Sequence, residues 1–306
     1  MSAQDHKSST STPLVELRNV SKVFGGGGAF SKRQVTALDN FSYVIQSSPA
    51  TITAVVGESG SGKSTMANML LGLERPTSGE VLYNGKNIWN FNRSERRTFR
   101  REVQAIFQDP YGVYNSFYKV DHVLTTPVAK FKMARSNAET DQMISQALLA
   151  VGLRPEDTLG RYPHQLSGGQ RQRTMIARTL LLRPRIIVAD EPVSMVDASL
   201  RVTILASLLK LKTEFGISLL YITHDLATAY QISDHIIVLN RGVVVEQGTP
   251  DEVVKNPQHP YTQLLISSIP QADPNKSWGE SPADPAGGKG DHRQVDIGAS
   301  ATQSGH

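Results

Sequence analysis

The sequence predicts an α/β protein built on a parallel β-sheet that helices cover on both faces. Short apolar runs alternate with helical segments in the second half of the chain, which is typical of parallel sheets. A strand, a glycine-rich loop and a helix follow one another at residues 51–73. The strands before residue 50 look antiparallel, and residues 109–165 lack strand signals. We therefore expect an antiparallel β subdomain and an inserted α-helical subdomain beside the parallel core.

The stretch Gly57–Thr65 fits the pattern G-x-x-x-x-G-K-[ST], which binds phosphate when a strand precedes it and a helix follows. Thr51–Val56 is the expected strand and Thr65–Leu73 the expected helix. Glycines let backbone N–H groups surround a phosphate, and the helix N-terminus adds positive charge. We expect Lys63 to reach the β- and γ-phosphates and the Ser64 hydroxyl to ligate Mg²⁺. The residues expected to bind nucleotide here are Gly57, Glu58, Ser59, Gly60, Ser61, Gly62, Lys63, Ser64 and Thr65.

The strands expected before and after this loop have clear turn signals between them. Leu14–Val20 alternates as a strand that ends near Phe24, and the glycines at residues 25–28 indicate a loop. Phe41–Ile45 resumes the alternation. Glu80–Tyr83 is another strand, and the Asn-Gly pair that follows it predicts a tight turn.

The next segment combines positive charge with a short strand. Asn92–Arg101 contains five arginines in ten residues. A solvated helix or loop face explains them better than nucleic-acid binding does, because no aromatic stacking platform accompanies them. Val103–Phe107 follows as an apolar strand that ends at Gln108.

Helices and parallel strands are expected to complete the fold. Helical periodicity appears within residues 109–165, for example at Met143, Ala147 and Leu148. A further helix is expected over Gln170–Leu182. The remaining strands are expected at Ile186–Ala189, Ser218–Ile222 and His235–Leu239, with a closing edge strand at Val243–Gln247.

Composition narrows the possible classes of protein. The net charge of +4 is small for 306 residues and does not require a nucleic-acid partner. The absence of cysteine excludes disulfides, thiolate zinc sites and cysteine-held iron–sulfur clusters. No apolar run approaches the roughly 20 residues that span a bilayer, and the N-terminus lacks the apolar segment of a secretory signal. We expect a soluble intracellular chain whose membrane role, if it has one, comes through a partner.

Polar side chains at the ends of three apolar strands predict a catalytic centre beside the phosphate loop. Because the carboxyl ends of parallel strands meet at one edge of a sheet, Asp190 is placed to hold Mg²⁺ and Glu191 to accept a proton from water. Gln108 ends another strand and is expected to orient water and contact Mg²⁺, although alone it fits a polar strand cap. His224 ends a third strand, where it is placed to contact the γ-phosphate and position Glu191. A lone His is more often structural, so this assignment depends on its neighbours.

The string Leu166-Ser-Gly-Gly-Gln170 predicts a second anion-binding helix start. It lies over one hundred residues from the phosphate loop, and one triphosphate does not need both sites. We infer that one of the two sites serves a nucleotide bound to another subunit.

Taken together, these motifs resemble those of the ABC-family ATPases, over about residues 13–270. The family's motifs are matched in order by Gly57–Thr65 (Walker A), Phe107–Pro110 (Q-loop), Leu166–Gln170 (signature), Ile186–Glu191 (Walker B), Ser194–Asp197 (D-loop) and Thr223–Asp225 (H-switch). The resemblance implies a P-loop NTPase core of the RecA-like type with ATP and Mg²⁺ as cofactors. It also implies that Phe24 stacks on adenine and that Asp197 belongs to the nucleotide site.

The family arrangement further implies a head-to-tail dimer with two ATP molecules in its interface. Each ATP would lie between the Walker motifs of one chain and the signature of the other. The signature residues implied in binding the partner's ATP are Ser167, Gly168, Gly169 and Gln170, with Ser167 and Gly169 at its γ-phosphate.

A narrower resemblance concerns residues 256–270. The string His259–Thr262 is similar to the C-terminal element of the dipeptide/oligopeptide importer ATPases, although an ordinary helix broken by proline also fits. Residues 108–111 fit that subfamily, whereas residues 112–117 depart from its usual continuation. The cargo class therefore stays open between peptides, oligosaccharides and nickel.

The expected layout has four parts. Residues 1–12 are expected to be disordered, 13–250 to form the ATPase domain, 251–270 the C-terminal element and 271–306 a disordered tail. The helical subdomain is expected within this domain at about residues 109–175.

The resemblance implies the ATP-hydrolysing subunit of an importer, peripheral to the cytoplasmic face of the membrane. Its expected partners are an identical or paralogous ATPase subunit, the permease and, indirectly, an extracytoplasmic substrate-binding protein, without nucleic acid. A non-transport ABC ATPase is an alternative, but ribosome-acting members usually carry two cassettes and chromosome-acting members a long coiled coil. A module that only senses ATP would usually lack Glu191 or His224.

Overall fold

The computed structural model describes residues 12–25, 34–109, 112, 114–194 and 196–268. The strands are β1 (Val15–Phe24), β2 (Val35–Ile45), β3 (Ile52–Val56), β4 (Ser78–Tyr83), β5 (Lys86–Asn87), β6 (Val103–Ile106), β7 (Ile186–Asp190), β8 (Ser218–Thr223), β9 (His235–Asn240) and β10 (Val243–Gly248). The helices are α1 (Lys63–Leu70), α2 (Arg93–Glu102), α3 (Asp121–Phe131), α4 (Asn137–Ala150), α5 (Pro155–Thr158), α6 (Gly168–Leu181), α7 (Ala198–Thr213), α8 (Leu226–Ile232), α9 (Pro250–Lys255) and α10 (Pro260–Ser267), with short 3-10 turns at Ile88–Asn90 and Pro163–Gln165.

The larger sheet is parallel except at one edge. Its strand order is β10-β9-β3-β8-β7-β6, and only the β9–β10 pair is antiparallel. All five residues of β3 are buried, which is what a central strand covered on both faces requires. The predicted parallel core and the predicted closing edge strand are both confirmed.

The smaller sheet is antiparallel, in the order β2-β1-β4-β5. Asn84 and Gly85 join β4 to β5 with positive φ angles of 49° and 76°, as a tight hairpin turn requires. One buried cluster joins this sheet to α1 and to one face of the parallel sheet, and includes Leu17, Met66 and Val55. The antiparallel assignment of the early strands is therefore confirmed, and the shared core attaches the smaller sheet to the larger one.

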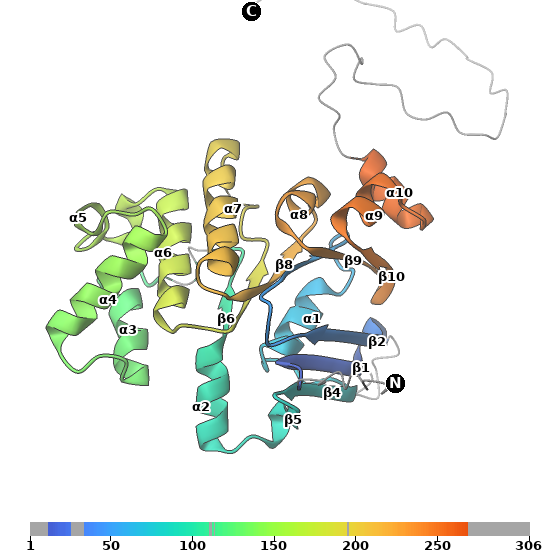
Figure 1. Ribbon diagram of the computed structural model, residues 1–306, viewed down its shortest axis with the longest axis horizontal. Helices are drawn as coiled ribbons and strands as arrows, with labels where there is room; N and C mark the ends of the chain where they lie inside the picture. Colours follow the sequence, from blue (N-terminus) through green and yellow to red (C-terminus); the bar gives the residue numbers. More distant parts are fainter. Residues whose placement is uncertain (1–11, 26–33, 110–111, 113, 195, 269–306) are drawn as a thin grey trace, which may run out of the picture. The chain divides into compact units, whose positions relative to one another are not determined.

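Helices α3 to α6 form a region of their own, drawn in green in Figure 1. Ser136 is the N-cap of helix α4, and its hydroxyl accepts a hydrogen bond from the Glu139 N–H at 3.1 Å. Leu148 on α4 and Ile176 on α6 are fully buried in the same hydrophobic cluster. This cluster continues to the parallel sheet, so the helical region and the core share buried apolar surface.

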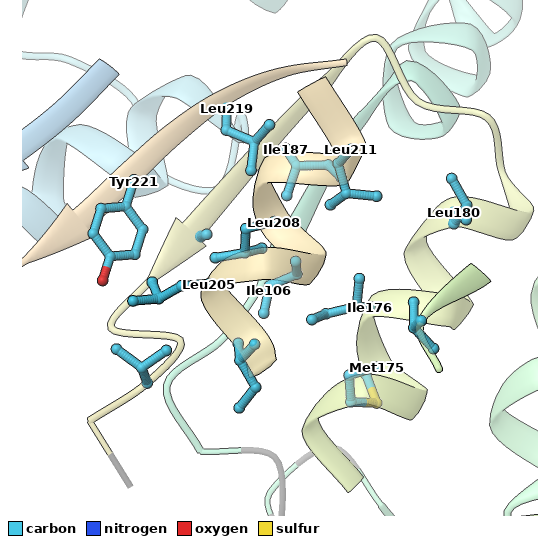
Figure 2. Close-up of a cluster of buried hydrophobic side chains, with 14 of the residues drawn as sticks. Ile106, Met175, Ile176, Leu180, Ile187, Leu205, Leu208, Leu211, Leu219 and Tyr221 are labelled. Atoms are coloured by element: carbon cyan, nitrogen blue, oxygen red, sulfur yellow. The ribbon is translucent and has the colours of Figure 1, made fainter. Parts of the chain in front are cut away.

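Figure 2 shows how α6 and α7 pack on the face of the sheet opposite α1. Leu205, Leu208 and Leu211 project from α7 toward Ile187 and Leu219 of the sheet. Their spacing of three residues keeps them on one side of the helix. This apolar face explains why α7 covers the strands that end in the polar residues of the candidate site.

Several element boundaries differ from the sequence prediction. Helix α1 begins two residues earlier than Thr65, because the phosphate loop passes directly into the helix, and it ends at Leu70. Gly72 adopts a positive φ of 68°, which prevents the helix from reaching Leu73. Strand β6 ends at Ile106, so Gln108 lies two residues beyond it.

The disorder predicted for residues 271–306, and for residues 1–11 of the N-terminal segment, lies outside the described residues. Within the described part of the chain, no helix is both long and apolar enough to cross a membrane. Four of the five arginines of α2 are exposed and Arg101 is half-buried, so the segment is mainly the solvated helix face that the sequence predicts.

Two adjacent leucines of α7 test the packing in Figure 2. Leu208 is 0% exposed and Leu209 is 38% exposed. We expect Leu208→Ala to lower the free energy of unfolding by about 2–5 kcal/mol, because it removes buried methyl groups and leaves a cavity. Leu209→Ala, which has the same chemistry on the same helix, should cost less than about 1 kcal/mol. Urea unfolding followed by circular dichroism measures both, and equal losses would contradict this packing.

Candidate nucleotide site

The phosphate loop connects β3 to α1, and close backbone contacts fix its shape. A Cβ on Gly57 would lie 2.1 Å from the Leu239 carbonyl oxygen, and a Cβ on Gly62 would lie 2.2 Å from that of Ala37. Gly62 is also the N-cap of α1, with φ at 106°. Both positions therefore require glycine, and the backbone of β9 and β2 confines the loop.

The Lys63 side chain is held inside this loop. Its Nζ donates hydrogen bonds to the carbonyl oxygens of Gly57, at 2.7 Å, and Glu58, at 2.8 Å. Lys63 is only 7% exposed, and burial lowers its pKa although the carboxylates of Glu191 and Asp190 oppose this effect. The loop thus holds a partly desolvated cation, which suits the binding of phosphate oxygens.

Four further predicted residues lie where strands of the sheet end. Asp190 is the last residue of β7 and Glu191 follows it, while His224 directly follows β8 and Gln108 follows β6. Strands β3, β8, β7 and β6 are consecutive neighbours in the sheet. A cavity of about 480 Å³ brings these side chains together with the phosphate loop; it is lined by Ala37, Ser59, Gly60, Gly62, Lys63, Ser64, Thr65, Gln108, Asp190, Glu191 and His224.

Asp190 and Ser64 form the part of the cavity best suited to a divalent cation. Burial raises the pKa of the Asp190 carboxyl, and the neighbouring Glu191 raises it further, whereas a hydrogen bond with Ser64 acts in the opposite direction. The described residues contain no cluster of three or more acidic, His or Cys side chains able to hold a metal. A hydroxyl, a carboxylate and the nearby Gln108 amide instead match Mg²⁺, which keeps waters and takes phosphate oxygens as ligands.

Glu191 and His224 form a direct pair at the edge of the cavity. His224 Nδ1 lies 2.7 Å from Glu191 Oε1, and the Glu191 side chain is 14% exposed. The Glu191 backbone has a positive φ of 48°, and its N–H donates to the Ile222 carbonyl oxygen at 2.9 Å. The neighbouring strand holds the Glu191 backbone in an uncommon conformation, and His224 contacts its carboxylate, an arrangement that suits a general base.

The signature residues stand apart from this cavity. Ser167 is the N-cap of α6, and its hydroxyl accepts from the Gln170 N–H at 3.2 Å while its own N–H donates to Gln170 Oε1 at 2.9 Å. Gly169 is buried, and a Cβ there would lie only 2.8 Å from Leu200 Cδ1. Ser167, Gly168, Gly169 and Gln170 are not among the described residues that line the cavity. The start of α6 is therefore well formed but is not part of this cavity.

Comparison with known proteins assigns the family. Residues 38–194 match the family described as ABC transporter, and residues 245–290 match the C-terminal region of oligopeptide/dipeptide transporters. The chain belongs to the ABC transporter family. The assignment includes its ATPase activity, since the matched region is the family's ATP-hydrolysing cassette.

Individual relatives cover most of the chain. The oligopeptide transport ATP-binding protein OppF of Streptococcus mutans is 42% identical over 261 residues, which are 85% of this chain and 83% of that protein. The dipeptide transport ATP-binding protein DppF of Haemophilus influenzae is 41% identical over 267 residues, or 86% and 80% of the two chains. A dimeric ATP-binding cassette solved with ADP and Pi superposes with a TM-score of 0.66 at 30% identity, covering 77% of this chain and 98% of that one.

Two residues that the family resemblance assigned to this ABC cassette also lie outside the cavity lining. Phe24 is the last residue of β1, 42% exposed, with Lys22 Nζ 4.9 Å from its ring centroid. Asp197 is the N-cap of α7, and its carbonyl oxygen accepts the N–H groups of Leu200 and Arg201. The sequence missed Ala37, which lines the cavity from β2. No sequence signal marks it, because only its backbone approach to Gly62 distinguishes it.

The Glu191 carboxylate can be tested in this ABC cassette without changing its shape. Glu191→Gln keeps the hydrogen-bonding geometry but removes the proton acceptor, so we expect kcat for ATP hydrolysis to fall about 10²–10⁴-fold. ATP affinity should stay within about threefold, because the phosphate contacts of the loop are unchanged. Phosphate release and equilibrium ATP binding measure the two effects.

The exposed Glu214, beyond the end of α7, supplies the control. Glu214→Gln removes the same charge far from the chemistry and should leave turnover as it is. Near wild-type turnover in Glu191→Gln would exclude Glu191 as the base.

Proposed function

We propose that this chain is the ATP-hydrolysing subunit of an importer for peptides, acting at the cytoplasmic face of the membrane. The observation that carries the proposal is the convergence of Lys63, Asp190, Glu191 and His224 on one cavity. The names of its relatives, which are oligopeptide and dipeptide transport proteins, support peptides over oligosaccharides or nickel. An extracytoplasmic binding protein would deliver the peptide to the permease, and nucleic acid has no role in this function.

The residues of the phosphate loop are proposed to bind the ATP phosphates through their N–H groups and through Lys63. Ser64, Asp190 and Gln108 would hold Mg²⁺, which would neutralise charge on the transferred phosphoryl group. Glu191 accepts the proton of the attacking water, and His224 keeps its carboxylate in place. Phe24 is the proposed contact to adenine.

The second half of the site is proposed to come from another copy of an ABC ATPase subunit. Ser167 lies at a helix start where a free N-terminus and a hydroxyl can meet a phosphate, yet it lies outside the chain's own cavity. The dimeric solved relative supports a paired arrangement. Gly168, Gly169, Gln170 and Asp197 would complete that half.

A groove of about 750 Å³ is the proposed docking site for the permease. It lies between α2 and α3, with Arg93, Arg96 and Arg100 on one side and Phe131 on the other. Arg97 joins the two sides, since its Nη2 donates to the Lys130 carbonyl oxygen at 2.8 Å. A groove of this mixed apolar and basic character suits a short amphipathic segment that carries acidic residues.

Two capping serines separate the partner role of Ser167 from its structural role. Ser167→Ala and Ser136→Ala each remove an N-cap hydroxyl and should each cost about 0.5–2 kcal/mol of stability. In a Glu191→Gln background with Mg·ATP, only Ser167→Ala should weaken dimerisation, by about tenfold or more, because a hydrogen bond to a charged phosphate is lost. Analytical ultracentrifugation measures this, and equal dimerisation by both variants would contradict the two-chain site.

Charge reversal tests the groove. We expect Arg93→Glu combined with Arg96→Glu to move the chain out of the membrane fraction of cells that contain the whole transporter, because acidic groups on the permease would be repelled. Arg154→Glu, at the exposed N-cap of α5 and outside the groove, is the control and should remain with the membranes. Quantitative immunoblots of both fractions decide, and an unchanged distribution of the double variant would exclude this docking site.

A further inference from the structure

The string His259–Thr262 has a physical explanation at the start of α10. His259 is the N-cap, and its Nδ1 accepts the Tyr261 N–H at 3.1 Å. Pro260 occupies the first helical position, where its fixed φ suits a helix and its missing N–H costs nothing. The string therefore starts a helix at a fixed place and orientation.

Glu246 anchors this helix start to the edge strand β10. Its two carboxylate oxygens accept the N–H groups of Gln258, at 2.8 Å, and His259, at 3.1 Å. Burial opposes ionisation, but these two backbone N–H groups hold the pKa of Glu246 below its ordinary value. Thr262, in the first turn of α10, is 0% exposed, so this helix start is also packed into the protein.

Tyr261 extends from this anchored helix to the phosphate loop. Its Oη accepts a hydrogen bond from the Glu58 N–H at 2.9 Å, across 203 residues of sequence. The ring packs against the main hydrophobic cluster, and burial raises the pKa of the phenol, so the hydroxyl stays neutral. The position of the hydroxyl is therefore set by the core and by the helix start together.

Glu58 is the residue through which this contact can influence the nucleotide. Its carbonyl oxygen accepts Lys63 Nζ at 2.8 Å and the Ser61 N–H at 3.2 Å. The Glu58 residue is thus bonded on one side to Tyr261 and on the other to the cation of the loop. A shift of Glu58 would therefore displace one of the carbonyl oxygens that hold Lys63 Nζ.

We propose that Tyr261 is a positioning residue that braces the phosphate loop from the C-terminal element, so that the loop is preorganised for a nucleoside triphosphate. Tyr261 accepts the N–H of Glu58, which is not among the described residues that line the cavity. Without the brace, part of the binding free energy goes into ordering the loop. The inference depends on the proposed function, since it concerns the same nucleotide.

Removal of one hydroxyl tests the brace. Tyr261→Phe keeps the ring in the core but leaves the Glu58 N–H without its acceptor. In a Glu191→Gln background we expect the Kd for ATP to rise about 3- to 10-fold, the range of one lost hydrogen bond. With Glu191 intact, KM for ATP should rise by a similar factor while kcat stays within about twofold, because the proton acceptor is unchanged.

Tyr230→Phe is the matched control. The Tyr230 hydroxyl donates to Asp251 at 2.8 Å, beside α9, and does not contact the phosphate loop. This variant should bind ATP as the parent does. Equal Kd values for Tyr261→Phe and the parent, or equal losses in both tyrosine variants, would overturn the brace.

A second variant covers the case in which Tyr261→Phe melts well below the parent. Glu246→Ala frees the start of α10 without touching Tyr261 or the loop, and should also raise the Kd for ATP, by at least about twofold. An unchanged Kd in that variant would then overturn the proposal. If the parent itself fails to bind ATP, the proposed function fails, which is a different result from a parent that binds and variants that match it.

Discussion

The parallel pairing of β3, β8, β7 and β6 is the constraint on which the rest of the structure depends. The phosphate loop, His224, the acidic pair and Gln108 lie at or just beyond the ends of these four strands, and only a shared direction and adjacent order bring those ends to one edge. The register pairs Val56 with Thr223 and Asp190 with Ile222, so the phosphate loop, the acidic pair and His224 begin at the same height. The apolar layers on the two faces fix that register, because a slip of one residue would move every buried side chain to the opposite face of the sheet.

On the proposed function, this edge forms one part of the ATP site, and the signature residues belong to a different part of the fold. The signature begins α6, whose buried face packs against α4 and α7 rather than on the phosphate loop. The start of α6 is therefore not part of the lining of the same chain's cavity. On the proposed function, a second subunit supplies this part of the site, and the nucleotide joins the two chains.

The sequence predicts the elements here better than their contacts. Thr51–Val56 and Ile186–Ala189 are unambiguous because central parallel strands are apolar throughout. The pairing of Glu191 with His224 was expected from their strand ends, and the structure brings the two atoms to 2.7 Å. Ala37 and Tyr261 could not be found in this way, because a backbone carbonyl near Gly62 and a hydroxyl 203 residues from its donor leave no local pattern.

The electrostatics of the cavity suit a ligand that carries both positive and negative charge. Asp190 and Glu191 lie together in a partly buried setting, which raises the pKa of Asp190, and Lys63 is the cation that faces both. Burial in turn lowers the pKa of Lys63, so one lysine does not fully balance two carboxylates and its own desolvation. A divalent cation would balance the charge of Asp190 and Glu191, while an anion would bind Lys63 and the N–H groups of the loop. Because Lys63, Asp190 and Glu191 all line one cavity, a ligand that carries charges of both signs can interact with all three.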